Sequence, residues 1–106
     1  SKISSLSAIE GIYWSFVDSA HAALIAANIP PASPEHIPAD LQQTFANNKM
    51  LKMKYVVWYK EILMLHKKIV HGEVKTLKGI EIDEWQNRGE EFLRTMAELV
   101  KDLIES

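Results

Sequence analysis

The stretch HKKIVHGE, residues 66–73, holds two of the four histidines of the chain, with two lysines between them and a glycine after them. An imidazole can bind a metal, transfer a proton or donate a hydrogen bond, and a lysine supplies a positive charge that attracts phosphate. These residue types are therefore compatible with a metal site, a metal-independent nuclease site or a phosphate-binding site. They are equally compatible with the basic C-terminal end of a helix.

The spacing of His66 and His71 argues against a metal site. Residues five apart on a helix point about 140° away from each other, whereas the two histidines of a helical metal site are spaced three or four residues apart. No carboxylate is placed to complete a site with either histidine. We therefore predict no bound metal and no other cofactor.

The two histidines belong to different stripes of the expected helix. His66 follows Tyr59 and Ile62 at helical spacing, which predicts a packed histidine, in a core or an interface, with one hydrogen-bond partner. His71 shares a basic stripe with Lys60 and Lys67, which lie eleven and four residues before it. That stripe is either a solvated surface or an anion site, in which the lysines attract phosphate and His71 donates a hydrogen bond or transfers a proton.

The charge of the chain is unevenly distributed. The net charge is −2, but residues 49–80 carry eight lysines and two acids, while residues 81–106 carry eight acids and three bases. A basic segment of this kind can bind a polyanion. Alternatively, the two segments lie side by side, within one chain or across a dimer, and neutralise each other.

The composition is that of one soluble globular domain. The chain has 106 residues, of which 47% are hydrophobic and 25% charged, and it contains no cysteine. This length supports a single hydrophobic core, and the lack of cysteine excludes a disulfide framework and a thiolate nucleophile. No apolar run approaches the length of a membrane span, so we expect no membrane association and a cytoplasmic protein.

Hydrophobic periodicity predicts an all-α fold with three long helices and one or two short ones. The long helices are expected over 9–27, over 51–71 with Gly72 as C-cap, and from about residue 83, with Gln86 in the capping-box position. A short helix begins with Ser33 as N-cap, in the connection that contains all four prolines, and ends near Asn47.

An antiparallel up-down bundle of four to five helices is the architecture expected for these elements. The expected stripe of the last helix consists of Ile82, Trp85, Gly89, Phe92, Met96, Leu99 and Leu103. A glycine within this stripe predicts a close contact with another helix. Residues 1–7 are interpreted as the remnant of a linker, and residues 8–106 as one domain excised from a longer chain.

Two stretches, SAHAALIAANIPPASPEHIP (19–38) and YKEILMLHKKIVHGE (59–73), resemble the HEPN superfamily of helical domains. The likeness covers roughly residues 9–104 and is strongest to the domains associated with archaeal nucleotidyltransferases of the polymerase-β type. It implies a non-catalytic domain that binds a nucleotide or another substrate beside a nucleotidyltransferase catalytic domain not present in this chain. A homodimer is also implied.

The family's motif is an arginine, then four to six residues of which the first is often polar, and then a histidine at the end of the third long helix. His71 matches that histidine and Lys67 the polar position, but His66 stands where the arginine would be. An arginine is always charged and can hold a phosphate at two points, which a mostly neutral imidazole cannot. The motif is therefore degenerate, and it favours binding over RNA cleavage.

Three hypotheses follow. The first is the accessory binding domain, with His66, Lys67, His71 and Lys60 as substrate-binding residues and no catalytic residue. The second is a metal-independent, toxin-like ribonuclease that binds RNA, in which His71 is the catalytic acid or base and Lys67 stabilises the transition state. The third is a structural bundle that mediates assembly only.

Overall fold

A computed structural model describes the backbone of residues 2–106 and the side chains of residues 5–106. Every regular element in this part of the chain is helical, which confirms the predicted all-α class. The elements are α1 (Lys2–Ala26), α2 (Ile37–Leu41), a π-helical turn η1 (Gln42–Ala46), α3 (Met53–Val70) and α4 (Gly79–Glu105).

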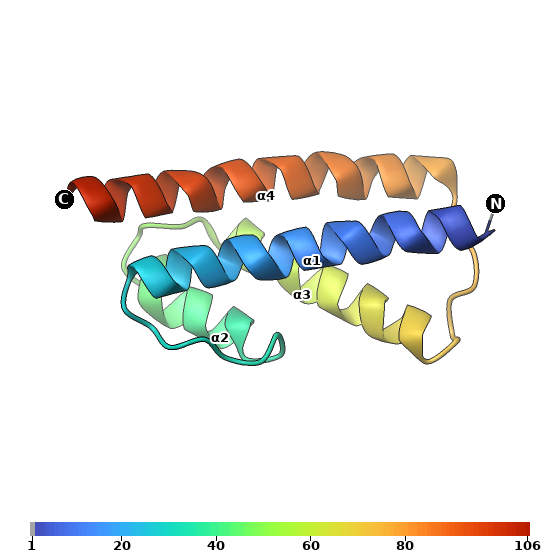
Figure 1. The fold of residues 1–106 in the computed structure, drawn as a ribbon, viewed down its shortest axis with the longest axis horizontal. Coiled ribbons are helices and arrows are strands. Elements are labelled where there is room, and N and C mark those ends of the chain that lie inside the picture. Colours follow the sequence, from blue (N-terminus) through green and yellow to red (C-terminus); the bar gives the residue numbers. More distant parts are fainter. Residues whose placement is uncertain (1) are drawn as a thin grey trace.

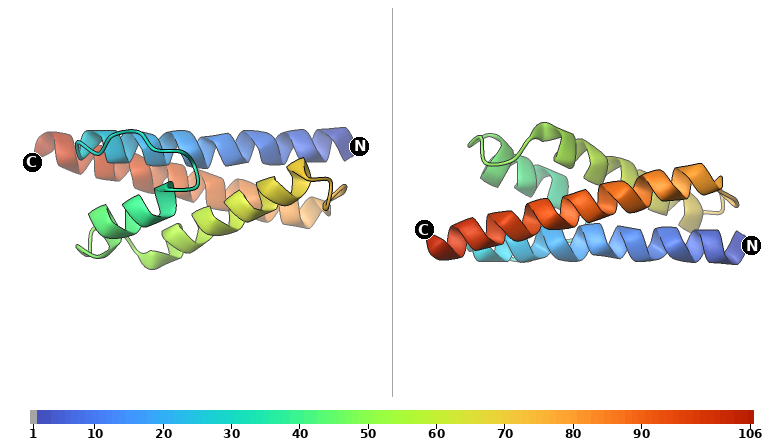
Figure 2. Two further views of the ribbon diagram at one scale, coloured as in Figure 1. Left: turned by 90° about the horizontal axis from the view of Figure 1, so that it is seen from below. Right: turned by 90° about the horizontal axis from the view of Figure 1, so that it is seen from above.

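The two longest helices, α1 and α4, lie side by side and run in the same direction, whereas α3 runs in the opposite direction (Figure 1). The predicted antiparallel up-down arrangement is not confirmed. The connection after α1 turns back along that helix, so that α2 starts again in the direction of α1 (Figure 2). Helices α2 and α3 both pack on one side of the α1–α4 pair.

Residues 2–7, interpreted from the sequence as a linker remnant, form the first turns of α1. Within the described residues there is no boundary between this segment and the domain. In the sequence, Ile3, Leu6 and Ile9 continue the apolar spacing of the helix. Residue 1 lies outside the described residues.

The proline-containing connection ends later than the sequence suggested. Residues 33–36 form a turn in which the His36 amide donates to the Ser33 carbonyl over 3.0 Å. The Ser33 hydroxyl lies 2.8 Å from His36 Nδ1 and does not cap a helix. Helix α2 therefore starts at Ile37, with Pro38 in its first turn, where a proline has no hydrogen bond to lose.

The end of α3 was predicted correctly, whereas the start of α4 was predicted wrongly. Gly72 follows α3 with φ of 73°, and the amides of Gly72 and Glu73 donate to the Ile69 and Lys68 carbonyls over 3.0 and 2.8 Å, a Schellman motif. The expected start of α4 at Asp83 is four residues too late. Glu81 takes the capping role, because its carboxylate accepts the Lys78 amide at 3.2 Å.

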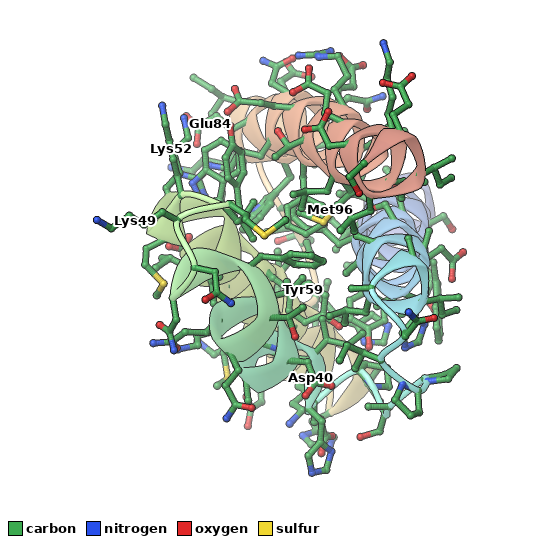
Figure 3. All side chains as sticks on the ribbon, turned by 90° about the vertical axis from the view of Figure 1, so that its left-hand side faces the viewer. Asp40, Lys49, Lys52, Tyr59, Glu84 and Met96 are labelled. Atoms are coloured by element: carbon green, nitrogen blue, oxygen red, sulfur yellow. The ribbon has the colours of Figure 1, made fainter. Side chains whose placement is uncertain are left out.

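The core lies between α1, α3, α4 and the short α2, and Tyr59 and Met96 point into it while Lys49 and Lys52 point to solvent (Figure 3). The predicted stripe of α4 is confirmed at Phe92, Met96 and Leu99, which are buried. The close contact predicted at Gly89 is also present. A Cβ atom built there would lie 3.3 Å from Ile12 Cγ2, so the glycine allows α1 and α4 to approach.

Candidate functional site

The C-terminal half of α3 and the connection before α2 enclose an open hollow of about 320 Å³, which α1 closes at its base through Tyr13. His66, Lys67 and His71 all line it, together with Ser33 and Glu35. The two histidines point to different faces of α3, as expected, and the hollow spans the edge between those faces. Three of the four candidate binding residues are thus brought together.

Lys60, the fourth candidate, lines a second hollow of about 440 Å³ between α2 and α3. Lys67 and Glu35 line both hollows, so they form the wall between them. Lys60 and Lys67 are seven residues apart on α3, which places their Cα atoms about 10 Å apart along the axis. The basic stripe predicted for this face is therefore continuous along the two hollows.

His66 is a packed residue, as the apolar stripe predicted. Its side chain is only 15% exposed, and its Nε2 lies 2.7 Å from Glu10 Oε2 on α1. The imidazole also stacks on the Tyr13 ring, with the ring centroids 3.8 Å apart and the planes parallel. One carboxylate and one aromatic face thus hold this ring in place, and His66 joins α3 to α1.

Glu10 is fixed by two donors. Its Oε1 accepts the indole N–H of Trp14 at 3.0 Å, and its Oε2 faces His66. The hydrogen bond from Trp14 holds the pKa of the Glu10 carboxyl below its ordinary value, with a further contribution from His66. Burial raises the pKa of the neighbouring Tyr13 phenol.

Lys67 is paired within the chain. Its ammonium lies 3.3 Å from Glu35 Oε1, and the two side chains are 42% and 63% exposed. An exposed pair of this kind is weak and exchanges readily with solvent ions. Glu35 therefore occupies, with an anionic oxygen, the position that the sequence assigned to a phosphate.

His71 is the C-cap residue of α3 and is exposed on the rim of the hollow. Among the described side chains it has no hydrogen-bond or ion-pair partner, and the same is true of Lys60. These two are the candidate residues whose polar atoms face solvent. The negative end of the α3 dipole lies beside His71 and favours a cation there over an anion.

The aromatic residues preceding this face do not offer a free stacking surface. Tyr59 is buried in the core. Trp58 is covered by cations of the chain itself, with Lys54 Nζ 5.2 Å and Arg88 Cζ 5.3 Å from its ring centroid. Arg88 also lies 5.0 Å from the Trp85 ring, which joins α3 to α4.

The remaining histidines are local structural elements. His21 is partly buried, with Nε2 2.8 Å from the Ala32 carbonyl oxygen, and it holds the connection against α1. His36 is exposed and bonded to Ser33. Within the described residues, no three histidine or acidic side chains converge as metal ligands would.

Sequence reasoning missed two residues of the site, Glu10 and Glu35. Glu10 lies 56 positions before His66, and its position on the N-terminal helix gives no local sign of the pairing. Glu35 lies in the connection before α2, 32 positions before Lys67, and gives no local sign of the pairing either. The uneven charge distribution could have pointed to both, because an acid-poor basic segment favours contacts with acids of the rest of the chain.

In comparisons with protein-family models, with curated proteins and with solved structures, the chain has no significant match. The resemblance to the HEPN superfamily accordingly stays a prediction from the sequence. Among the described residues, no helix combines the length and the hydropathy needed to cross a membrane.

Proposed function

We propose that this chain is a non-catalytic binding domain that holds a nucleotide, or another ligand bearing a phosphate, in the hollow at the C-terminal half of α3. The observation that carries the proposal is the convergence of Lys67, His71 and Ser33 on one open hollow of about 320 Å³. These groups supply a charge and hydrogen-bond donors to an anionic oxygen.

The second hollow extends the same surface. Lys60 lines this second hollow. A ligand with two phosphates, or with a phosphate and a further anionic group, would therefore meet a cation in each hollow. The lining between them includes the apolar side chains of Leu63 and Met64, against which a sugar or a base can pack. This arrangement favours a nucleotide over an inorganic ion.

Two features limit the affinity. Any anion must displace Glu35 from Lys67 or share the ammonium with it. The carbonyl end of α3 also repels a phosphate that lies beside His71. We expect binding by the isolated chain in the high micromolar to millimolar range, about −4 to −6 kcal/mol.

The partner in the proposal, a nucleotidyltransferase catalytic domain, comes from the sequence resemblance alone. A weak site on an accessory domain suits that arrangement, because a tethered catalytic domain would share the ligand and raise its effective concentration. The homodimer implied by the same resemblance is not required by the geometry of the hollow.

The packing of His66 supports the binding hypothesis over the ribonuclease hypothesis. The residue in the arginine position, His66, is stacked on Tyr13 and bonded to Glu10, so that it is not available to a phosphate in the way an exposed guanidinium would be. His71 is then not accompanied by the exposed arginine with which the ribonuclease motif pairs its histidine.

The test is a titration of the chain with ATP and with pyrophosphate, followed by NMR at low salt. We expect saturable shifts at Ser33, Leu63 and Val70, which line the hollow, that are lost in a Lys67→Ala/His71→Ala variant. The matched control is Lys52→Ala/Lys68→Ala. It removes two exposed lysines, Lys52 at the N-cap of α3 and Lys68 within α3, neither of which lines a hollow. Equal binding by all three proteins, or by none, contradicts the proposal.

A further inference from the structure

The outer face of α3 carries a row of exposed apolar side chains. Met53, Val57 and Met64 follow one another at intervals of four and seven residues, so they lie along one face of the helix. Their exposed fractions are 43%, 43% and 54%, and Met50, in the connection just before α3, is also exposed. Single exposed apolar residues are common on protein surfaces, whereas a row of them marks a contact surface. We call these three residues the methionine face.

A hollow lies beside the methionine face and makes this surface concave. It is the hollow of about 440 Å³ between α2 and α3, which Met64 borders and which Pro38, Ala39 and Leu63 line with apolar groups. Methionine side chains are flexible and polarisable, and they are common where a protein surface packs against a partner helix. A concave apolar surface beside a helix accepts the side chains of another helix.

The charges around the methionine face are almost all positive. Residues 47–68 contain six lysines and one acid, Glu61. That acid is paired with Arg88 of α4 at 3.0 Å, away from the methionine face. Two of the six lysines form ion pairs with acids of other elements. The exposed lysines without an ion pair to a described side chain are Lys49, Lys52, Lys60 and Lys68.

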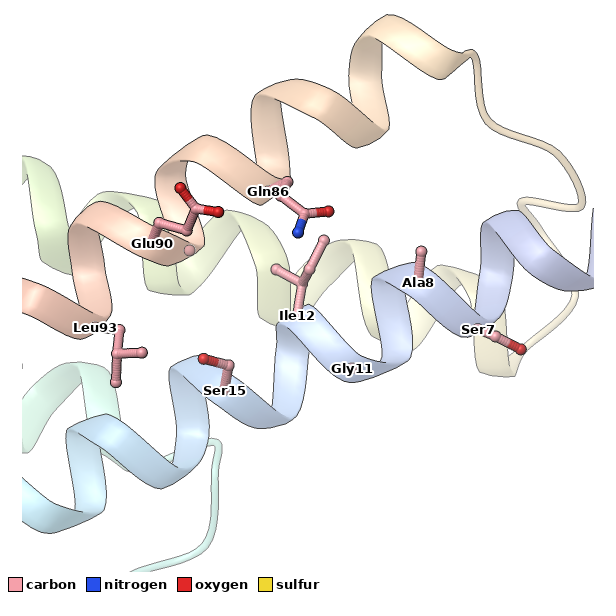
Figure 4. Close-up of a pocket in the computed structure, with 9 residues that line it drawn as sticks. Ser7, Ala8, Gly11, Ile12, Ser15, Gln86, Glu90 and Leu93 are labelled. Atoms are coloured by element: carbon pink, nitrogen blue, oxygen red, sulfur yellow. The ribbon is translucent and has the colours of Figure 1, made fainter.

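The groove between α1 and α4 is a second apolar surface, and it has no such ring of charge. Figure 4 shows its first hollow, of about 390 Å³, in which Glu90 is the one charged residue of the lining. The second hollow of this groove, of about 260 Å³, is lined by uncharged residues, among them Leu93 and Val100. An acidic partner would therefore be attracted to the methionine face and not to this groove.

We infer that the methionine face and the adjoining hollow bind an amphipathic helix of a partner protein whose apolar side is flanked by carboxylates. The large apolar side chains of that helix pack on Met53, Val57 and Met64. Its carboxylates face the lysines at the two sides of the row, among them Lys60 and Lys68. The inference rests on this charge complementarity and does not depend on the proposed function.

An anionic membrane surface fits this face less well than a helix does. A flat lipid surface leaves the hollow unfilled, and Glu35 at the edge of the hollow repels anionic headgroups. Surfaces that insert into a bilayer also present tryptophan, phenylalanine or leucine, which the methionine face lacks.

Single-stranded nucleic acid fits this face less well too, because it needs exposed aromatic rings on which its bases stack. The two aromatic residues in the middle of α3 are not free for stacking. Tyr59 is buried, and Trp58 is covered by Lys54 and Arg88.

The experiment is a titration of the 106-residue chain into a labelled synthetic peptide, followed by fluorescence anisotropy at low salt. The peptide is a helix of about five turns, with leucine at intervals of three and four residues and glutamate at the flanking positions. We expect saturable binding in the micromolar range, because a contact over about 17 Å of α3 is typical of transient complexes. The same peptide with lysine in place of glutamate should bind at least about tenfold more weakly.

Two variants test the two parts of the surface. Met53→Ser/Val57→Ser should weaken binding of the acidic peptide at least about tenfold, because it removes apolar contact area. Neither residue lines a hollow of the proposed ligand site, so the binding of pyrophosphate should not change. Lys49→Glu/Lys68→Glu should weaken binding of the acidic peptide and strengthen binding of the lysine peptide.

The matched controls lie on α4. Leu93→Ser/Ile104→Ser removes two exposed apolar side chains, and Arg94→Glu/Lys101→Glu changes the net charge by the same amount as the lysine variant. Both should bind the acidic peptide as the original chain does, and circular dichroism establishes that each variant is folded.

Three outcomes overturn the inference. The first is the absence of saturable peptide binding up to about 1 mM, the weak limit of specific association. The second is binding that the methionine-face and lysine variants leave unchanged. The third is tighter binding of phosphatidylserine-containing vesicles or of oligouridylate than of the acidic peptide, which would identify a membrane or a nucleic acid as the occupant.

Discussion

His66 and His71 are five residues apart on the same helix, yet they lie in different kinds of surroundings. His66 is stacked on Tyr13, bonded to Glu10 and largely buried. His71 caps α3 at the rim of an open hollow, with solvent around its ring. The difference shows that a histidine's neighbours in space decide its role. His66 belongs to the packing of α1 against α3, and His71 is free to meet a ligand.

The largest effect that distinguishes the two histidines is on stability. His66→Ala removes a stacked ring and a hydrogen bond and leaves Glu10 without that partner, and we expect it to lower the free energy of unfolding by about 2 kcal/mol. His71→Ala, at an exposed cap, should change it by less than about 0.5 kcal/mol. Urea denaturation of the two variants measures the difference, and equal losses would contradict the assignment of the two roles.

A smaller effect concerns the partner of His66. The pKa of Glu10 is lowered in the folded chain, so that its ionised form stabilises the fold at neutral pH. This contribution is present above the unfolded pKa, 4.5, and is lost as the pH falls through the lower, folded pKa.

We therefore expect Glu10→Gln to lower the melting temperature at pH 7 and to reduce the loss of stability below about pH 4.5. The effect at pH 7 should stay below about 1 kcal/mol, because half of the Glu10 side chain is exposed. Thermal unfolding between pH 7 and pH 3 measures it, with Glu84→Gln, an exposed acid without a described hydrogen bond, as the control. A variant whose pH profile matches that of the original chain would show that Glu10 does not hold His66.

The smallest effect on stability is expected for the exposed ion pair between Glu35 and Lys67. Glu35→Gln removes the partner of Lys67, and we expect a change within about 0.5 kcal/mol because the pair is exposed. The same substitution should strengthen the binding of pyrophosphate several-fold, since it removes the carboxylate that competes for the ammonium. Calorimetry of the two proteins at equal salt measures this. Weaker binding by the variant would show that Glu35 contributes to the site in another way.

The sequence predicted the helices better than their ends and their directions. Apolar spacing identified the stripe of α4 and the close contact at Gly89, and a single glycine located the end of α3 correctly. The start of α2 was placed three residues too early, because Ser33 bonds His36 instead of capping a helix. The start of α4 was placed four residues too late, because Glu81 serves as the capping acid. Local signals of capping are ambiguous where two suitable residues lie within one turn of each other.

The candidate site was predicted in part. The sequence named His66, Lys67 and His71, and it separated the packed histidine from the basic stripe on helical geometry alone. It did not identify Glu35 or Glu10, since both come from other elements and meet α3 only through the tertiary fold. The carboxylate that sits on Lys67 changes the chemistry of the site, because a cation that is already paired attracts a phosphate less strongly.

By itself the sequence determined the all-α class, the faces of the long helices and the basic stripe from Lys60 to His71, because these depend on residue spacing within one helix. The tertiary structure decided that α1 and α4 run in the same direction, that His66 rests on Tyr13, and that Glu35 reaches Lys67. It also decided which helix face remains uncovered. Such pairings join residues far apart in the chain, and only the packing of the core brings them together.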